Sequence, residues 1–265
     1  MTETMTTVTR PRELRELFGL RFWDASLDDV ADFLVGCAIR GERFRGFFVN
    51  AHCVNVAARD EAYAKLLGES PCLFADGVGM SIAARLHGLR LRHNVNGTDL
   101  FPRLCAAAAR ADVPIALLGA RPGVAATCAQ RMQDQIPGLR VAWTGHGYLT
   151  AGEEALHLQH LNASGARILL VAKGVPVQEH WIARNGERVE APVLLGVGAL
   201  LDFYSGAVPR APRLVRRLQA EWVYRLLQEP KRLSRRYLLG NPAFIARTLR
   251  WRASGRGLRP AGAGR

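Results

Sequence analysis

The chain shows a recurring pattern of short hydrophobic runs separated by longer amphipathic or polar segments. Runs of this length bounded by turn residues predict buried β-strands, and here they fall at 47–49, 72–74, 114–118, 139–143, 168–171 and 193–195. Helical spacing of apolar residues predicts helices at 26–40, 52–67, 99–110, 124–135 and 153–161. Strands that alternate with helices form parallel βαβ units, so residues 1–208 are predicted to form an α/β domain.

Residues typical of caps mark the ends of several of these helices. Ser26 precedes the first helix, which carries Asp28 and Asp29 in its first turn, where carboxylates favour the helix dipole. Gly68 is predicted to end the second helix, and Asp99 is predicted to cap the third.

The pattern changes at Pro209, after which only helical spacing is present. Apolar residues recur at that spacing, with arginines between them, at Leu214, Leu218, Trp222 and Leu226. Pro230 and Pro242 are predicted to break the helices in this part of the chain. We therefore predict a basic all-helical C-terminal appendage over 209–252 and a disordered tail, rich in Gly, Ala and Arg, over 253–265.

Composition narrows the class of protein. The 265 residues suffice for one large domain or two small ones, and 49% apolar with 22% charged residues is typical of a globular protein. The apolar run 191–201 is short and broken by proline and glycine, which argues against a transmembrane helix, and the N-terminus lacks the apolar stretch of a secretory signal. Five widely spaced cysteines without a C-x-x-C pair predict neither a disulfide framework nor a zinc site, and favour a reducing cytoplasm.

Charge is distributed unevenly. Residues 1–208 hold 21 Lys and Arg against 21 Asp and Glu, whereas residues 209–265 hold 15 against two, so the formal net charge of +13 lies entirely in the C-terminal part. A basic block of this kind is typical of proteins that meet phosphates, in nucleic acid or in anionic lipid headgroups. The alternative is a solvated basic face without a partner.

Polar loops follow three of the predicted strands. In a Rossmann-like parallel sheet, ligands lie beyond the carboxyl ends of the strands. Asp76, in the first loop, is flanked by glycines that leave backbone N–H groups free to approach a ligand. It could serve as a general base, a metal ligand or an acceptor for a ribose hydroxyl, and the alternative is a helix N-cap.

Each of the other two loops could bind a ligand or serve only as a structural turn. Gly119 and Arg121 lie in a turn that resembles a phosphate-binding loop but lacks the full G-x-G-x-x-G pattern, so a tight βα turn is the alternative. Gln178 and Glu179 begin a helix and suit recognition of sugar hydroxyls or an amide, or else form a capped, solvated first turn. The polar loop 94–99 is equally ambiguous.

Histidines do not make a convincing metal site. His157 and His160 lie three residues apart near Glu153 and Glu154, a pattern that is more typical of an exposed helix face than of metal ligands. His146, between two glycines, has no evident partner in the sequence. We therefore predict no metal site.

Taken in order, the loops resemble one family, the WecG/TagA/CpsF bacterial glycosyltransferases (glycosyltransferase family 26). The resemblance covers about residues 45–250 and is specific as an ordered set. Its matching segments are 49–52 (VNAH), 75–79 (ADGVG), 96–100 (NGTDL), 117–120 (LLGA), 137–139 (PGL), 145–148 (GHGY), 174–179 (GVPVQE), 196–199 (GVGA), 210–212 (RAP), Glu221, Trp222, Arg225, 229–233 (EPKRL), 235–237 (RRY) and 240–242 (GNP).

The resemblance implies a metal-independent enzyme without a cofactor that moves a sugar from a UDP-sugar, with inversion, onto a polyprenyl-diphosphate-linked glycan. It also implies action at the cytoplasmic face of the plasma membrane, with an appendage that helps to close the active site and to dock on the bilayer. By the same resemblance Asp76 is the catalytic base and Gln178 lies in the active site. The substrate-binding candidates are Asn50, His52, Asn94, Asn96, Thr98, Asp99, Gly119, Arg121, Gly145, Glu179 and Arg210.

The chain departs from the family pattern at three of these loops. Asn94 stands where many members carry arginine, Phe48 replaces a threonine, and Val177 replaces a lysine before the Gln-Glu pair. The departures point to an exopolysaccharide branch of the family. They leave the donor sugar, the acceptor glycan and the oligomeric state open.

The sequence leaves two other classes of function as alternatives. A nucleotide-dependent oxidoreductase would use the same βα turns, but it predicts a fuller dinucleotide fingerprint and an acidic residue about 20 positions later. A nucleic-acid-binding protein would use the basic appendage, but none of the common reader motifs is present in the sequence, so no nucleic-acid partner is predicted.

Overall fold

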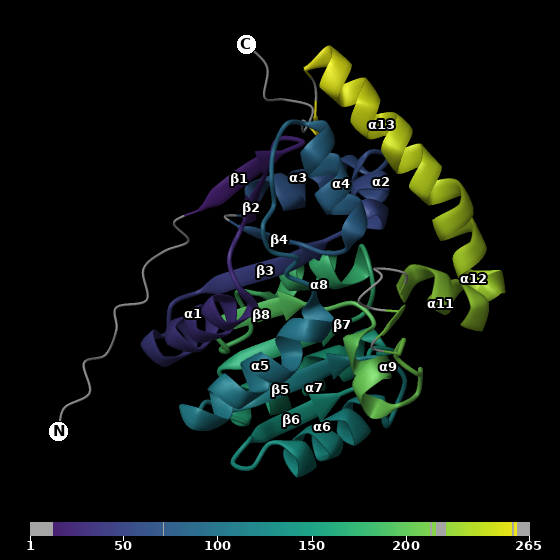
Figure 1. The fold of residues 1–265 in the computed structure, drawn as a ribbon. Coiled ribbons are helices and arrows are strands. Elements are labelled where there is room, and N and C mark those ends of the chain that lie inside the picture. Colours follow the sequence, from purple (N-terminus) through teal and green to yellow (C-terminus); the bar gives the residue numbers. More distant parts are fainter. Residues whose placement is uncertain (1–12, 71, 213, 216–220, 256, 259–265) are drawn as a thin grey trace.

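A single mixed sheet runs through the α/β part of the computed structural model, which describes residues 13–70, 72–212, 214–215, 221–255 and 257–258 (Figure 1). Its order is β1-β2-β4-β3-β8-β7-β5-β6, and every pairing is parallel except that of β1 with β2. The strands are β1 (Leu14–Leu17), β2 (Leu20–Trp23), β3 (Phe44–Val49), β4 (Leu73–Ala75), β5 (Ile115–Gly119), β6 (Val141–Gly145), β7 (Ile168–Ala172) and β8 (Val193–Gly196). The predicted parallel sheet is confirmed.

Helices cover both faces of the sheet, and each face has its own hydrophobic core. One core joins the sheet to α1 (Leu27–Arg40), α5 (Gly97–Arg110), α6 (Val124–Gln135) and α9 (Leu200–Ser205). The other joins it to α2 (Ala51–Ala57), α3 (Glu61–Glu69), α4 (Val78–Leu86), α7 (Ala151–Ala163), α8 (Val177–Asn185) and α13 (Gly240–Ser254). Successive residues of a strand point to opposite cores, which is why the central strands are hydrophobic throughout.

Local polar bonds explain where the first helices begin and end. Ser26 caps α1 as predicted, because its side chain accepts from the Asp29 N–H while the Asp29 carboxylate accepts from the Ser26 backbone. The single helix predicted at 52–67 is wrong: α2 ends at Ala57, and Asp60 caps a new helix, α3. Asp99 is not the N-cap of α5; Asn96 holds that position and accepts from the Asp99 N–H.

The C-terminal appendage consists of α11 (Glu221–Gln228), α12 (Pro230–Ser234), a π-helical turn η1 (Arg235–Leu239) and α13. Pro230 separates α11 from α12 as predicted, since it occupies the first turn of α12. Pro242 does not break a helix; it is the third residue of α13, which continues directly from the π-helical turn η1. The predicted helical residues Arg213 and 216–220 lie outside the described residues.

The long helix α13 is part of the folded body and lies beside α2 and α4 (Figure 1). Phe244 is 1% exposed and contacts Phe18 edge-on, with 6.1 Å between ring centroids. The Asn55 side-chain amide donates to the Gly240 carbonyl at 2.7 Å, and the His87 imidazole is 3.3 Å from the Thr248 carbonyl. These contacts fix the appendage on the α/β body.

Truncating Phe244 tests this attachment. We expect Phe244→Ala to lower the free energy of unfolding by about 3–5 kcal/mol, because it removes a fully buried ring and leaves a cavity. Leu249→Ala, on an exposed position of the same helix, should change it by less than about 0.5 kcal/mol. Urea unfolding followed by circular dichroism measures both, and equal stabilities of the two variants would contradict the attachment.

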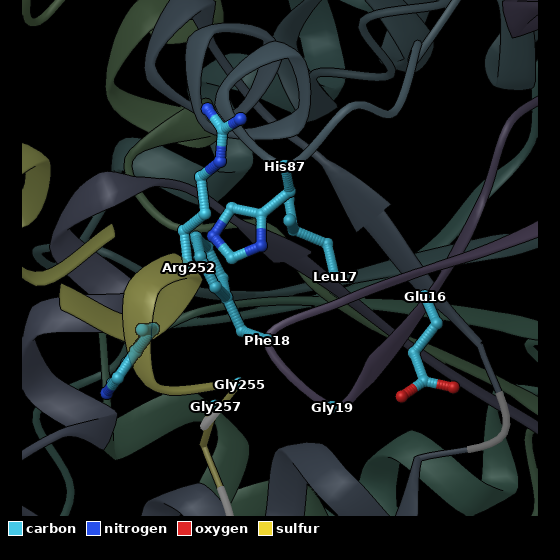
Figure 2. A pocket seen from close by; sticks show the side chains of 9 residues that line it. Glu16, Leu17, Phe18, Gly19, His87, Arg252, Gly255 and Gly257 are labelled. Carbon is cyan, nitrogen blue, oxygen red and sulfur yellow. The ribbon is translucent and has the colours of Figure 1, made fainter. Parts of the chain in front are cut away.

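Of the tail predicted to be disordered at 253–265, the structure describes residues 253–255 and 257–258. Ala253 and Ser254 complete α13, and the buried Leu258 donates its N–H to the Phe18 carbonyl at 2.7 Å. The turn between β1 and β2, His87 and the end of α13 surround a cavity of about 310 Å³ (Figure 2). Residues 256 and 259–265 lie outside the described residues.

Candidate active site

A second cavity, of about 400 Å³, lies at the carboxyl ends of β3 and β4 and is covered by the appendage. The α/β body contributes the loops after β3 and β4 and the start of α5, while α11, η1 and α13 contribute the opposite wall. Its lining residues are Asn50, Ala51, His52, Asp76, Gly77, Val78, Gly79, Ile82, Asn94, Asn96, Thr98, Asp99, Phe203, Glu221, Trp222, Arg225, Arg236, Tyr237, Asn241, Phe244 and Ile245.

Asp76 is one of three half-buried carboxylates that line this cavity, with Asp99 and Glu221. It follows β4 directly, and its N–H donates to the Val49 carbonyl at 2.9 Å, which holds the loop against β3. The Asn50 side-chain amide donates to Asp76 Oδ2 at 3.3 Å. Burial raises the pKa of Asp76, while Asn50, Arg236 and Arg225 oppose this rise. The residue is thus a carboxylate whose affinity for a proton is higher than usual.

Asn50 and His52 belong to the turn that follows β3. Asn50 caps α2 by accepting from the N–H groups of His52 and Cys53, so its side-chain amide is free to point to Asp76. Burial and the nearby Arg236 lower the pKa of His52 to about 4, so its imidazole is neutral at pH 7. Both residues line the cavity, and their roles in substrate binding stay predictions.

The loop before α5 brings four more predicted residues to the same cavity. Asn94 accepts from the Gly77 N–H at 2.7 Å and so joins this loop to the loop of Asp76. Asn96 caps α5, and its side-chain amide donates to the Asp99 carboxylate at 2.7 Å. Thr98 and Asp99 line the cavity beside them. The helix of Asp99 therefore presents polar side chains toward Asp76.

The appendage adds two arginines that the sequence analysis did not single out as site residues. Arg225 on α11 stacks over the Phe203 ring at 5.0 Å, and Arg236 in η1 lies over Tyr237 at 5.6 Å. The Nε of each is buried without a hydrogen-bond partner. Both line the same cavity as Asp76, and their charges oppose the rise in its pKa. They form a cationic wall suited to an anionic ligand.

Gln178 and Glu179 lie in the first turn of α8 and do not line the cavity. They are 1% and 0% exposed, respectively. The Gln178 amide donates to Glu179 Oε1 at 2.9 Å, and Gln178 Oε1 accepts from the Gly198 N–H at 2.8 Å. Burial raises the pKa of Glu179 to about 7. In this arrangement the pair holds the loop after β8, and direct contact with substrate stays a prediction.

The other predicted binding residues lie farther along the same edge. Gly119 ends β5 and pairs with Ala172, and a Cβ there would come within 2.3 Å of the Ala172 carbonyl oxygen. Gly145 ends the neighbouring strand β6, and Arg121 is exposed just beyond β5. These three do not line the 400 Å³ cavity. Their binding roles stay predictions.

The sequence predicts no metal site, and the absence of a metal stays a prediction. Within the part of the chain that the structure describes, no three His, Cys, Asp or Glu side chains come together as a metal site. Among the same residues, no helix is long and apolar enough to cross a membrane.

Comparison with known proteins decides the family. The model of the glycosyl transferase WecG/TagA/CpsF family matches residues 15–257, which include the whole cavity. The chain belongs to this family. It is a glycosyltransferase whose fold and motifs agree with the resemblance seen in the sequence.

Two relatives of known function share the same name. The N-acetylglucosaminyldiphosphoundecaprenol N-acetyl-beta-D-mannosaminyltransferases of Staphylococcus aureus strains MW2 and NCTC 8325 are each 31% identical to this glycosyltransferase over 186 residues. The match covers 70% of this chain and 72% of each relative. Their name describes transfer of a sugar onto a lipid-diphosphate-linked sugar.

Proposed function

We propose that this glycosyltransferase moves a sugar from a UDP-sugar onto a polyprenyl-diphosphate-linked glycan, with inversion and without a metal or another cofactor. The observation that carries the proposal is that Asp76 lines one cavity together with two arginines whose buried Nε atoms have no hydrogen-bond partner. A base and a cationic wall are the two groups that such a transfer needs. The named relatives, which act on a lipid-diphosphate-linked sugar, support the choice of acceptor.

The reaction is a single displacement. Asp76 takes the proton of the acceptor hydroxyl as its oxygen attacks the anomeric carbon, and the bond from that carbon to the UDP oxygen breaks. The electron pair goes to the diphosphate, whose charge Arg225 and Arg236 stabilise. Because one nucleophile replaces one leaving group from the opposite side, the anomeric configuration inverts.

The nucleotide end of the donor fits the other half of the sheet edge. Gly119 and Gly145 end adjacent strands without side chains, and the planar guanidinium of Arg121 stands exposed beside them. The start of α6, three residues after Arg121, adds backbone N–H groups. We assign the nucleotide to these loops and the reacting sugar to the cavity.

The acceptor's lipid suggests how the enzyme meets the membrane. Three leucines are exposed on the two elements of the appendage that help to line the cavity: Leu227 on α11 by 76%, and Leu238 and Leu239 in η1 by 59% and 66%. The cationic side chains of Lys231 and Arg235 are exposed between them. Apolar side chains with basic neighbours suit the surface of an anionic bilayer. We propose peripheral binding to the inner face of the bacterial plasma membrane, in synthesis of an exopolysaccharide or another cell-surface polysaccharide.

Charged substitutions in these leucines test the membrane surface. We expect Leu238→Glu/Leu239→Glu to lower binding to anionic liposomes by roughly tenfold or more, since it removes two apolar contacts and adds two negative charges. Leu156→Glu, at an exposed leucine on α7, is the matched control. Flotation with vesicles of phosphatidylglycerol measures binding. Equal flotation of all three proteins would remove the proposed surface.

Ligand binding separates the proposal from its rivals. Calorimetry with UDP and with NAD, together with a salt-dependent gel-shift assay with DNA and RNA, compares the three classes of partner. We expect binding of UDP, no binding of NAD and no specific retention of nucleic acid. Binding of NAD in place of UDP would favour an oxidoreductase and contradict the proposal.

A further inference from the structure

Arg210 was predicted to bind substrate, but the structure places it between two carboxylates. It lies in the segment that joins α9 to the appendage, and its Nη2 donates to Asp99 Oδ1 at the start of α5. Its Nε lies 3.8 Å from Glu221 Oε1 at the start of α11. The side chain is 21% exposed. One guanidinium thus joins the α/β body to the appendage across the rim of the cavity.

The partners of Arg210 are themselves held in place. Asp99 receives the Asn96 side-chain amide at 2.7 Å and belongs to the first turn of α5. The Tyr204 hydroxyl donates to the Thr98 carbonyl at 2.7 Å, which ties α9 to the same turn. The Arg210 guanidinium therefore meets a fixed carboxylate on the body side.

The other side of the bridge is α11, a helix without a fully buried residue. Across 221–228, all of which the structure describes, no residue of α11 is buried. Glu221 and Arg225 lie one helical turn apart, so they share a face of α11, and both line the cavity. Arg210 holds Glu221, and Phe203 lies under the Arg225 guanidinium. These two contacts, together with the packing of Trp222 on Tyr237 at 5.8 Å between ring centroids, hold α11 over the cavity.

We propose that Arg210, Asp99 and Glu221 form a clasp that positions Arg225 beside Asp76, so that Arg210 is a positioning residue and not a ligand of the substrate. The proposal rests on the proposed function, because Arg225 is there assigned to the leaving diphosphate. The Nε atoms of Arg210, Arg225 and Arg236 are all buried without a hydrogen-bond partner, but Arg210 also donates to Asp99 and lies 3.8 Å from Glu221, so its charge already faces two carboxylates. The clasp is partly exposed, so salt should weaken it.

Kinetics of Arg210→Gln, with Arg103→Gln as the matched control, test the clasp. Arg103 lies one turn after Asp99 on α5 and pairs with Asp28 at 2.5 Å on the surface. We expect Arg210→Gln to lower kcat roughly tenfold with little change in KM for either substrate, and Arg103→Gln to match the wild type. Arg210→Lys keeps the charge but cannot bridge two carboxylates, so it should fall between them. A rise in KM alone would indicate a substrate ligand and overturn the proposal.

Combination with Arg225→Gln shows whether Arg210 acts through Arg225. If it does, adding Arg210→Gln to Arg225→Gln should cause no further loss of kcat. Full multiplication of the two losses would show independent roles and overturn the proposal. Glu221→Gln, on a helix without buried residues, opens the other side of the clasp with less risk to folding. It should reproduce the loss seen with Arg210→Gln.

A measurement that does not depend on catalysis tests the clasp separately from the proposed function. Trp222 follows Glu221 on α11, so acrylamide quenching of its fluorescence reports how closely α11 is held. The signal is isolated by subtracting the Trp222→Phe protein. We expect greater quenching in Arg210→Gln than in Arg103→Gln. Unchanged quenching with full transfer activity would overturn the clasp alone, whereas absence of transfer in the wild type would overturn the proposed function alone.

Discussion

Asp76→Asn is expected to lower turnover by roughly 10²–10⁴-fold, the range that general-base catalysis supplies. Asparagine keeps the shape of the side chain but cannot accept the proton of the acceptor hydroxyl. Binding of UDP should persist, because the nucleotide is assigned to loops away from this carboxyl. Transfer of a radiolabelled sugar to the lipid fraction measures the loss. Asp134→Asn, at an exposed position of α6, is the control and should match the wild type.

The pH dependence of the same residue follows from its burial. Because burial raises the pKa of Asp76, the basic form is lost as pH falls through that raised value, and turnover should decline at a pH above the usual range for aspartate. A carboxyl whose pKa is raised by folding stabilises the protein at low pH, and this contribution is lost as pH rises. Asp76→Asn should therefore raise the melting temperature at neutral pH. A lower melting temperature would contradict the desolvated state of Asp76.

The second large effect belongs to the cationic wall. Arg225→Gln/Arg236→Gln should lower kcat by about 10²–10³-fold, because the charge that develops on the leaving diphosphate loses its stabilising partners. Arg250→Gln/Arg252→Gln removes the same charge from exposed positions of the same appendage, so it controls for attraction to the membrane. Steady-state transfer assays compare the two double variants. Equal activity of both would show that the wall does not act in the reaction.

The alternation of strands and helices could be predicted because each buried strand is apolar on both sides, as in β5 and β7. The hairpin of β1 and β2 could not, since its strands are four residues long and its turn depends on Phe18, a residue with φ of 61° that packs on α13. The break at Asp60 also escaped the pattern, because apolar spacing continues across it. Packing partners distant in the sequence decide such details.

Some residues of the candidate site could be predicted from the sequence, and others could not. Asn50 and Asp76 could be predicted because each directly follows a strand, and parallel strands bring such positions to one edge. Arg225 and Arg236 could not be separated from the other arginines of the appendage, since their positions depend on how α11 and η1 fold over that edge. Their aromatic neighbours Phe203 and Tyr237 are the signal that sequence reasoning could have weighed. The burial of Gln178 depends on Gly198, which a local pattern does not show.

Product analysis tests the central claim most directly. The purified full chain is incubated with a panel of UDP-sugars and a polyprenyl-diphosphate-linked sugar, and the lipid-linked product is examined by mass spectrometry and nuclear magnetic resonance. We predict that one UDP-sugar gives a lipid-linked product with inverted anomeric configuration, and that Asp76→Asn forms it roughly 10²–10⁴-fold more slowly while still binding UDP. Retained configuration, or equal product from Asp76→Asn, would contradict the central claim.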